Sequence, residues 1–263
     1  MDECGNYYIE DIGGRVGRGG FGEVYKCYVY NRAKTHKKVY ARKYFSPSPE
    51  NNSTPIREIA DLRERFLVEI KTQCKLNSLD HSAIAPIVLY NTYGEQPYFI
   101  MELAQCNLLD AIHQGMDDTE KADAIIQVLK GVKLIHDNNY YHRDLKPENV
   151  LRYSNNTYKI SDFGLVKDMD ALRAEVKTKF NAKGLGSDGY RAPEIQDSAL
   201  FSVQSDIFAL GKIISDVYAG TAPQKIKQVI TTCRQFFPDD RYRSVDELLG
   251  AFQRAITPMS EVA

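Results

Sequence analysis

Acidic, basic and amide side chains stand within eight positions of one short stretch, YYHRDLKPENVL at residues 140–151. Within it, Asp144 and Lys146 are two residues apart, and Asn149 follows three residues later. Such a density of charge is typical of a solvated surface loop, yet apolar residues precede and follow it. A carboxylate, an ammonium group and an amide at this spacing could accept a proton, neutralise an anion and bind a cation.

A second acidic position follows eighteen residues after Asp144, in the tripeptide Asp162-Phe163-Gly164. The tripeptide alone has little meaning, because it occurs often by chance. Together with Asp144 and Asn149, it supplies oxygen atoms of the kind that bind Mg²⁺ arriving with a nucleotide. A calcium site is the alternative, but the spacing does not follow an EF-hand loop.

Glycines recur near the N-terminus, in GRGGFGEV at residues 17–24. Glycines at this spacing let backbone N–H groups approach a phosphate closely. A plain glycine hairpin and a dinucleotide-binding turn are the alternatives. The dinucleotide turn needs a helix directly after the glycines, whereas VYKCYVY continues as a strand, which excludes it. Lys43 lies one strand later and could reach the same phosphates, although a lone lysine in a strand is usually an exposed edge residue.

The elements that must position these residues change character along the chain. Val- and Tyr-rich alternation predicts strands in the first hundred residues, and one helix with Ile59, Leu62, Phe66 and Ile70 on one face. A Pro/Ser/Asn-rich connector at 46–55 separates them. From Asp117, which stands three residues before Glu120, the pattern becomes mainly helical. We therefore expect an α+β fold of two lobes, with a ligand cleft at their boundary.

Composition excludes several classes of protein. The 263 residues carry a net charge of −1, so nothing suggests nucleic-acid or membrane attraction. Five scattered cysteines without a CxxC pair argue against a disulfide framework or zinc site. With no long apolar run and no leader-like N-terminus, we expect a cytoplasmic protein.

The motifs together resemble the eukaryotic-type protein kinase family, from about residue 9 to about residue 255. They comprise the glycine stretch, Lys43, the 142–149 loop, Asp162–Gly164 and Ala192-Pro193-Glu194. The resemblance implies one bilobal α+β catalytic domain over residues 1–263. Its N-lobe would span about 1–102, its hinge about 102–107 and its C-lobe about 108–257.

The resemblance also implies a role for each motif residue. Asp144 would be the catalytic base and Lys146 would steady the transferred phosphoryl group, while Asn149 and Asp162 would hold Mg²⁺, or Mn²⁺ in its place. Lys43, paired with Glu69, would hold the phosphates of ATP. The other ATP-binding residues would be Gly17, Gly19, Gly22, Val24, Ala41, Met101, Glu102, Leu103 and Ala104.

The lysine of HRDLKPEN is typical of serine/threonine kinases, although dual specificity stays open. Arg143 beside the catalytic aspartate suggests control by activation-loop phosphorylation. Thr178 is the first candidate for autophosphorylation, with Ser187 as a second regulatory hydroxyl, and self-association would serve the reaction between two copies. The partners would then be ATP and a protein substrate.

The C-terminal part departs most from the family pattern. Phe208 stands where the family usually has Trp, and only 21 residues separate Gly211 from Cys233. We expect a shortened lobe in which Arg241 pairs with Glu194. Two alternatives remain, a catalytically inactive binding protein with the kinase fold and a small-molecule kinase. Retention of Lys43, Asp144 and Asp162 argues against the first, and the Ala-Pro-Glu segment argues against the second.

Overall fold

The structure is a computed structural model that describes residues 1–18, 22–47, 56–168, 189–198 and 201–257. The chain divides into two compact units. Unit 1 comprises residues 1–105 and 162–164, and unit 2 comprises residues 106–161 and 165–263. Unit 1 is built around a sheet and unit 2 mainly from helices, so the predicted α+β fold is confirmed.

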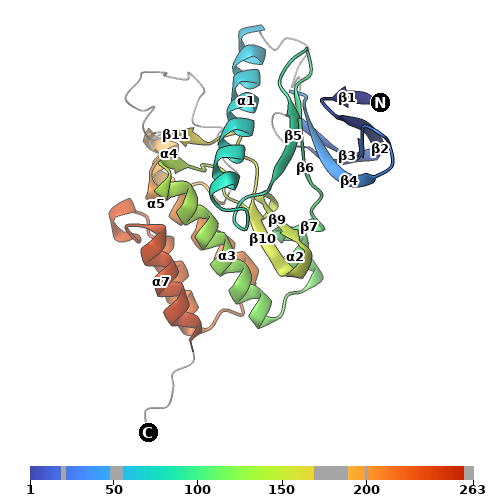
Figure 1. The fold of residues 1–263 in the computed structure, drawn as a ribbon. Coiled ribbons are helices and arrows are strands. Elements are labelled where there is room, and N and C mark those ends of the chain that lie inside the picture. The colour runs from blue at the N-terminus through green and yellow to red at the C-terminus, as the bar shows by residue number, and fades with distance from the viewer. Residues whose placement is uncertain (19–21, 48–55, 169–188, 199–200, 258–263) are drawn as a thin grey trace. The chain divides into compact units, whose positions relative to one another are not determined.

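Unit 1 contains a six-stranded antiparallel sheet with the order β1-β2-β3-β4-β6-β5 (Figure 1). Strands β3 to β6 form where Val-, Ile- and Tyr-rich segments predicted them, whereas β1 and residues 7–14 of β2 were not predicted. The polar segment between β3 and β4 makes the expected turn, closed by the Lys34 N–H donating to the Asn31 carbonyl at 2.8 Å. The strands are β1 (Asp2–Cys4), β2 (Tyr7–Arg18), β3 (Gly22–Asn31), β4 (Lys37–Phe45), β5 (Ile87–Asn91) and β6 (Tyr98–Glu102).

The two faces of this sheet carry different cores, because side chains alternate along each strand. On one face, Phe45 and Phe99 pack against α1 (Ile56–Leu79). On the other face, Ile9, Cys27 and Ile100 form part of a second buried cluster. The central strands β4 and β6 therefore have both faces covered.

Helix α1 contacts the sheet through Phe66 and Ile70, which are almost fully buried. Leu62 is half-buried in the same cluster, as the helical spacing predicted. Ile59 is 39% exposed, so its predicted place on the buried face is wrong. The reason is positional, because Ile59 lies in the first turn of a helix of 24 residues, ahead of the residues that contact the sheet.

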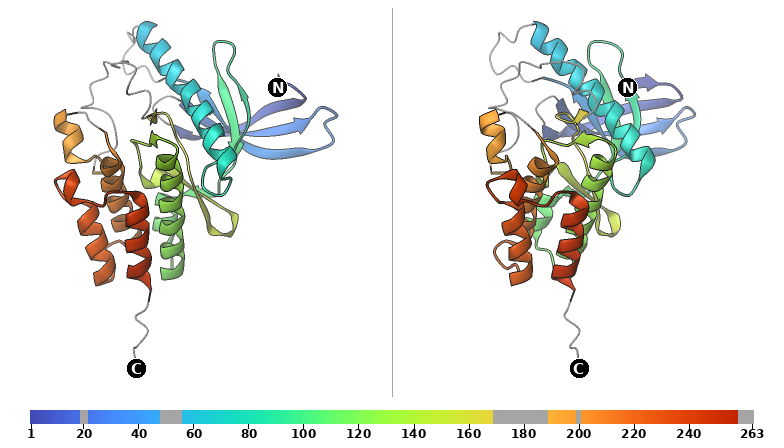
Figure 2. Two further views of the ribbon diagram at one scale, coloured as in Figure 1. Left: turned by 60° about the vertical axis from the view of Figure 1, so that its left-hand side comes forward. Right: turned by 90° about the vertical axis from the view of Figure 1, so that its left-hand side faces the viewer.

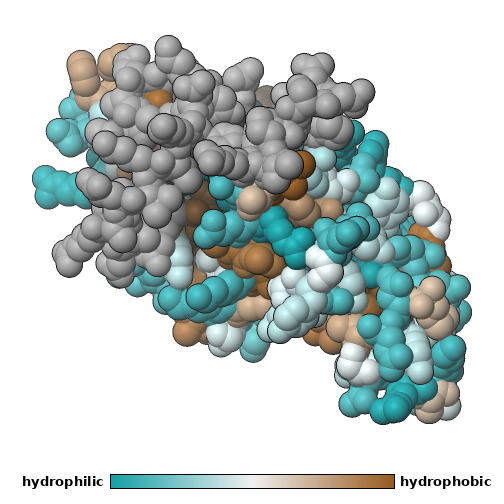
Figure 3. Space-filling view, turned by 90° about the horizontal axis from the view of Figure 1, so that it is seen from above, coloured by the Kyte–Doolittle hydropathy of each residue, from teal (hydrophilic) through white to brown (hydrophobic). Residues whose placement is uncertain are grey.

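The two edges of the curled sheet approach each other. Strand β1 pairs with β2 and also contacts β5, and the Cys4 thiol donates to the Tyr90 carbonyl at 3.8 Å. Hydrophilic and intermediate residues dominate the outer surface of the strands at the right of the space-filling view (Figure 3).

Unit 2 is organised around helices that lie side by side (Figure 2). Helix α3 begins after Asp117, whose carboxylate accepts from the Glu120 N–H at 2.8 Å, so the predicted cap is present. At Gly211 a Cβ would lie 2.5 Å from Cys233, which brings α5 and α6 close together. The helices are α2 (Leu108–Gln114), α3 (Asp118–Asp137), α4 (Pro193–Ser198), α5 (Val203–Tyr218), α6 (Gln224–Cys233) and α7 (Val245–Ile256).

Short strands of unit 2 lie next to the charged loop. Strands β9 (Val150–Tyr153), β10 (Thr157–Ile160) and β7 (Cys106–Asn107) form one small sheet. Strands β8 (Tyr140–Tyr141) and β11 (Lys167–Asp168) form another. The 140–151 loop thus leaves one strand and enters another, which explains its apolar flanks. Among the described helices, none has the length and apolar character needed to span a membrane.

Candidate active site

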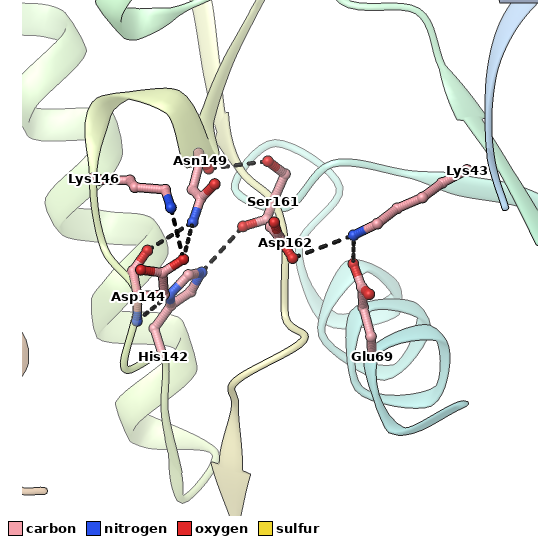
Figure 4. A network of polar contacts seen from close by, with 8 residues as sticks. All are labelled: Lys43, Glu69, His142, Asp144, Lys146, Asn149, Ser161 and Asp162. Atoms are coloured by element: carbon pink, nitrogen blue, oxygen red, sulfur yellow. Dashed lines mark hydrogen bonds and ion pairs between the residues drawn. The ribbon is translucent and has the colours of Figure 1, made fainter. Parts of the chain in front are cut away.

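Lys43 is the centre of a polar group in unit 1. Its Nζ donates to Glu69 Oε1 at 2.6 Å and to Asp162 Oδ1 at 3.2 Å (Figure 4). The lysine is 5% exposed and Glu69 is fully buried. The structure therefore brings together three residues that are 26 and 119 positions apart in the chain.

Charge neutralisation makes this burial tolerable. Burial opposes the charge of Lys43, but Asp162 and Glu69 outweigh it and raise the pKa of the lysine above its ordinary value. Burial raises the pKa of Glu69 to about 7, against the opposing effect of Lys43. The lysine is thus a cation at neutral pH, as anchoring a polyphosphate requires.

Packing places Glu69 under Lys43. Its neighbour Ile70 and Phe66, one turn earlier, hold α1 against the sheet, so the carboxylate is fixed between apolar anchors. Its second oxygen, Oε2, is buried without a hydrogen-bond partner among the described residues. A buried carboxylate in this position is an expensive arrangement, which marks Glu69 as more than a surface residue of a helix.

Asp162 differs from Glu69 in exposure and backbone geometry. Its side chain is 30% exposed, and its φ of 61° lies in the left-handed region, which is rare for residues other than glycine. The next residue, Phe163, is fully buried and fixes the segment. Strain of this kind is commonly retained where a carboxylate must face a ligand.

The register of the sheet gathers predicted ATP-binding residues on one face. Val24 lies opposite Lys43, and Ala41 lies opposite Met101, on adjacent strands. Gly17 lies opposite Val24 in the same row. Glu102 ends β6 and pairs with Lys38 at 3.7 Å, and two half-buried residues follow it outside regular structure. Those two residues are Leu103 and Ala104.

The glycines of the 17–24 stretch have different constraints. A Cβ at Gly22 would lie 2.3 Å from the Tyr44 carbonyl oxygen, so the sheet itself demands glycine there. A Cβ at Gly17 would make only an ordinary contact, 3.7 Å from Val24. The contacts within the sheet therefore give no steric reason for glycine at position 17. Gly19 lies outside the described residues.

Asp144 is the centre of the polar group in unit 2. Its Oδ2 accepts from Lys146 Nζ at 2.9 Å and from Asn149 Nδ2 at 3.1 Å (Figure 4). Asn149 also donates to the Asp144 backbone carbonyl at 2.7 Å. The carboxylate is therefore oriented by two side chains of its own loop, and the Asn149 amide oxygen is the atom with which that residue could bind a cation.

A buried aspartate of α5 holds this loop in shape. Asp206 accepts from the backbone N–H of His142 at 2.9 Å and of Arg143 at 3.0 Å, and from His136 at 2.8 Å. Burial alone would raise the pKa of Asp206, but these partners outweigh it and keep the pKa below its ordinary value. The sequence prediction assigned no role to Asp206. The signal was a single charge in the apolar stretch DIFALG of α5.

His142 and Ser161 complete the support of the loop. His142 is fully buried and its ring contacts the Ser161 carbonyl at 3.1 Å. The Ser161 hydroxyl and backbone N–H both donate to the Asn149 carbonyl, at 3.0 and 2.9 Å. The loop is thus anchored at both ends by buried hydrogen bonds, which answers why so many polar residues lie between apolar segments.

Asn149 of unit 2 and Asp162 of unit 1 were each predicted to bind Mg²⁺. Among the described residues no group of three or more His, Cys, Asp or Glu side chains could hold a metal by itself. Mg²⁺ that arrives with a nucleotide needs only one or two carboxylates, because phosphates and water complete its shell. The residues present therefore fit a nucleotide-bound Mg²⁺ better than a metal held by protein alone.

Of the predicted regulatory residues, the structure describes one. Arg143 has a φ of 69°, and its guanidinium lies 3.9 Å from the Phe201 ring centroid. Thr178 and Ser187 both lie outside the described residues.

The predicted ion pair between Glu194 and Arg241 is present. Two guanidinium nitrogens of Arg241 donate to the two carboxylate oxygens of Glu194, at 2.9 and 2.8 Å. The bidentate geometry and the 4% exposure of Arg241 make this a buried tie.

Comparison with known proteins agrees with this geometry. The protein kinase domain model matches residues 11–248. The chain belongs to the protein kinase family.

Similar kinases come from plants and bacteria. A cyclin-dependent kinase F-3 of Oryza sativa subsp. japonica is 30% identical over 77% of this chain and 42% of its own length. A probable serine/threonine-protein kinase PknB of Lactococcus lactis is also 30% identical, over 79% of this chain and 31% of its own length. A probable serine/threonine-protein kinase PBL28 of Arabidopsis thaliana is 31% identical over 78% of this chain and 52% of its own length. The matches thus span about a third to a half of these relatives.

Proposed function

We propose that this kinase domain transfers the γ-phosphoryl group of ATP, with Mg²⁺, to serine or threonine hydroxyls of proteins. The observation that carries the proposal is the geometry of Asp144, which is oriented by Lys146 and Asn149 and lies on a loop held by Asp206. A fixed carboxylate beside an ammonium group suits a base for a hydroxyl and a clamp for the transferred phosphoryl group.

Unit 1 would supply the nucleotide contacts. Lys43 would hold the α- and β-phosphates and Glu69 would keep its ammonium group in place. Gly17, Val24, Ala41 and Met101 lie on the same face of the sheet and would contact the nucleotide from it. Bound Mg²⁺ would neutralise phosphate charge, held by Asp162 and Asn149. Units 1 and 2 would then be the two lobes of one catalytic domain, linked through residues 102–107.

The serine/threonine preference is supported by Lys146 and by the similar kinases, whose names describe serine/threonine-protein kinases. A catalytically inactive binding protein is disfavoured, because Lys43, Asp144 and Asp162 each keep partners suited to catalysis. A small-molecule kinase is disfavoured by the buried Glu194–Arg241 pair, which fixes the Ala-Pro-Glu segment typical of protein kinases.

Autophosphorylation of Thr178, with Ser187 as a second site, would make this kinase self-activating between two copies. The five cysteines are free, which is compatible with the reducing cytoplasm in which we expect it to act.

The test is intact-mass measurement after incubation of the full chain with Mg-ATP, with and without a histone as a basic acceptor. The parent should gain mass in steps of one phosphate and should phosphorylate the histone on serine or threonine. Asp144→Asn should do neither, while nucleotide binding and thermal unfolding stay close to those of the parent. ATP binding without transfer by the parent would overturn the proposed function and favour the inactive binding protein.

A further inference from the structure

Two adjacent phenylalanines after α6 are exposed to solvent. Phe236 and Phe237 are each 63% exposed, and their rings contact each other edge to face, with centroids 5.1 Å apart. Most large apolar side chains of unit 2 are buried, so a pair of exposed aromatic rings is unusual for this unit. Exposed aromatic pairs are characteristic of protein-binding surfaces. We call these two residues the Phe236–Phe237 surface.

The backbone under these rings is fixed, although the rings are exposed. The buried Arg241 donates from Nε to the Gln235 carbonyl at 2.8 Å and from Nη2 to the Phe236 carbonyl at 2.9 Å. The same guanidinium holds Glu194 and the Gln204 carbonyl. A partner therefore meets a preorganised surface and loses little free energy in ordering it.

Charge around the surface favours a cationic partner. Asp239 and Asp240 follow directly in a short 3₁₀ turn, both exposed, and neither has an ion-pair partner in the part of the chain that the structure describes. Of the arginines in this segment, only Arg243 is exposed, so the two aspartates and Arg243 together leave a net charge of −1 at the surface. Arg241 is buried against Glu194, and Arg234 directs its guanidinium to the Gly189 carbonyl and the Phe208 ring.

The surface is connected to the segment that flanks Asp144. Arg234 Nη1 donates to the Gly189 carbonyl at 3.0 Å, and Arg241 binds Glu194 five residues later. Between them, Tyr190 and Arg191 line a small pocket together with Asp144. All of these residues belong to unit 2, so a protein held at the Phe236–Phe237 surface is presented to the same unit that carries the proposed base.

We propose that the Phe236–Phe237 surface is a docking site for protein substrates whose docking segment combines an apolar side chain with Lys or Arg. The inference rests on the proposed function in one respect, because only an active kinase has protein substrates. Binding at this surface does not itself depend on phosphoryl transfer. The apolar side chain would cover the two rings, and the cation would pair with Asp239 or Asp240.

The first experiment measures steady-state kinetics of Phe236→Ser/Phe237→Ser in the full chain. With a histone as acceptor, KM should rise about tenfold, because loss of a hot-spot aromatic pair commonly weakens binding by that amount or more. KM for ATP and kcat should stay within about twofold. Tyr93→Ser is the matched control, because Tyr93 is 85% exposed in unit 1 and should change none of these values. An unchanged histone KM in the double variant would overturn the proposal.

The second experiment separates docking from catalysis. A synthetic peptide of alternating Arg and Leu, without Ser or Thr, is titrated against Asp144→Asn with and without the two Phe→Ser changes. Binding should weaken about tenfold in the triple variant, and the same peptide with Glu for Arg should bind neither protein. If the parent transfers no phosphate but the Arg-Leu peptide binds as described, the proposed function fails and the docking site stands.

A second copy of the chain is the competing occupant. Sedimentation velocity of the parent and the double variant distinguishes it. Three results together would show that the surface is an interface between copies and that the proposal is wrong. They are a dimeric parent, a monomeric double variant and a histone KM that the substitutions leave unchanged. Equal sedimentation of both proteins, combined with the raised histone KM, supports substrate docking.

Discussion

Arg42 and Lys43 are consecutive residues of β4, and both are buried cations. Because side chains alternate along a strand, they point to opposite faces of the sheet. Lys43 faces α1 and the carboxylates of Glu69 and Asp162. Arg42 faces the inside of the curled sheet and is 2% exposed. The two positions therefore offer a comparison of two uses of a buried charge within one strand.

The partners of Arg42 are structural. Its guanidinium lies 3.8 Å from the Tyr98 ring centroid and 4.3 Å from that of Tyr44, and it pairs with Asp2 at 2.6 Å and Asp11 at 3.4 Å. Both carboxylates belong to ordinary strand residues, with side chains 55% and 37% exposed. Stacking on two rings and pairing with two strands joins β1, β2, β4 and β6.

The partners of Lys43 have a different character. Glu69 is buried with one oxygen unpaired among the described residues, and Asp162 combines a left-handed backbone with partial exposure. These features raise the free energy of the folded state, whereas the contacts of Arg42 with Asp2, Asp11 and Tyr98 join β4 to other strands. Burial of a cation is therefore not itself a sign of function. The left-handed backbone of Asp162 and the burial of Glu69 distinguish the two cases.

Lys43→Met should have the largest effect, which is on the rate of phosphoryl transfer, and should show most clearly how Lys43 differs from Arg42. Phosphoryl transfer should fall by roughly 10²–10³-fold, because a preorganised charge on the phosphates is lost. Histone phosphorylation at saturating ATP measures it. Lys43→Met/Glu69→Gln, which removes both charges of the pair, is the control for folding and should unfold at a urea concentration close to that of the parent.

Arg42→Met should change stability instead of rate. We expect the free energy of unfolding to fall by about 2 kcal/mol, because the variant keeps much of the volume but loses two cation–π contacts and two ion pairs. Urea unfolding followed by tyrosine fluorescence measures the change. If histone phosphorylation slowed more than about fivefold, Arg42 would have a part in the reaction, and its burial would not be purely structural.

Asp2→Asn should have a smaller effect on stability. The carboxylate is more than half exposed, so its pair with Arg42 is expected to contribute at most about 1 kcal/mol to the free energy of unfolding. The same urea experiment at low and high salt tests this value, and the difference from the parent should shrink as salt screens the pair. A loss as large as that of Arg42→Met would show that β1 pairing depends on this one contact.

Alkaline titration should show the smallest difference. The pKa of Lys43 is raised, so its contribution to the free energy of unfolding is complete below the ordinary lysine value of 10.5 and is lost only as pH rises toward the folded-state pKa. Above the titration of Glu69, the difference between the parent and Lys43→Met should therefore shrink by less than about 1 kcal/mol between pH 10 and pH 11. The difference between the parent and Arg42→Met should stay constant throughout, because arginine does not titrate there.

The sequence predicted the residues of the chemical motifs better than the residues that hold those motifs in place. Lys43, Asp144 and Asn149 were predicted from their residue types and spacing together with the family resemblance, and Glu69 was predicted from the resemblance alone. Arg42 could not be distinguished from a surface cation, because its burial depends on β1 lying across the sheet. Asp206 was assigned no role from the sequence, because its hydrogen bonds to the loop are set by tertiary packing with residues 63 and 64 positions away. Burial of long-range partners is the information that a single sequence lacks.

The near-closure of the sheet by β1 and β5 has a further consequence. An open sheet presents two edge strands whose unpaired N–H and C=O groups can pair with another molecule and begin aggregation. Here each edge lies against the other, and the Cys4 thiol already occupies the Tyr90 carbonyl. The strand that holds Arg42 in place thereby also shields unit 1 from edge-to-edge association with other copies.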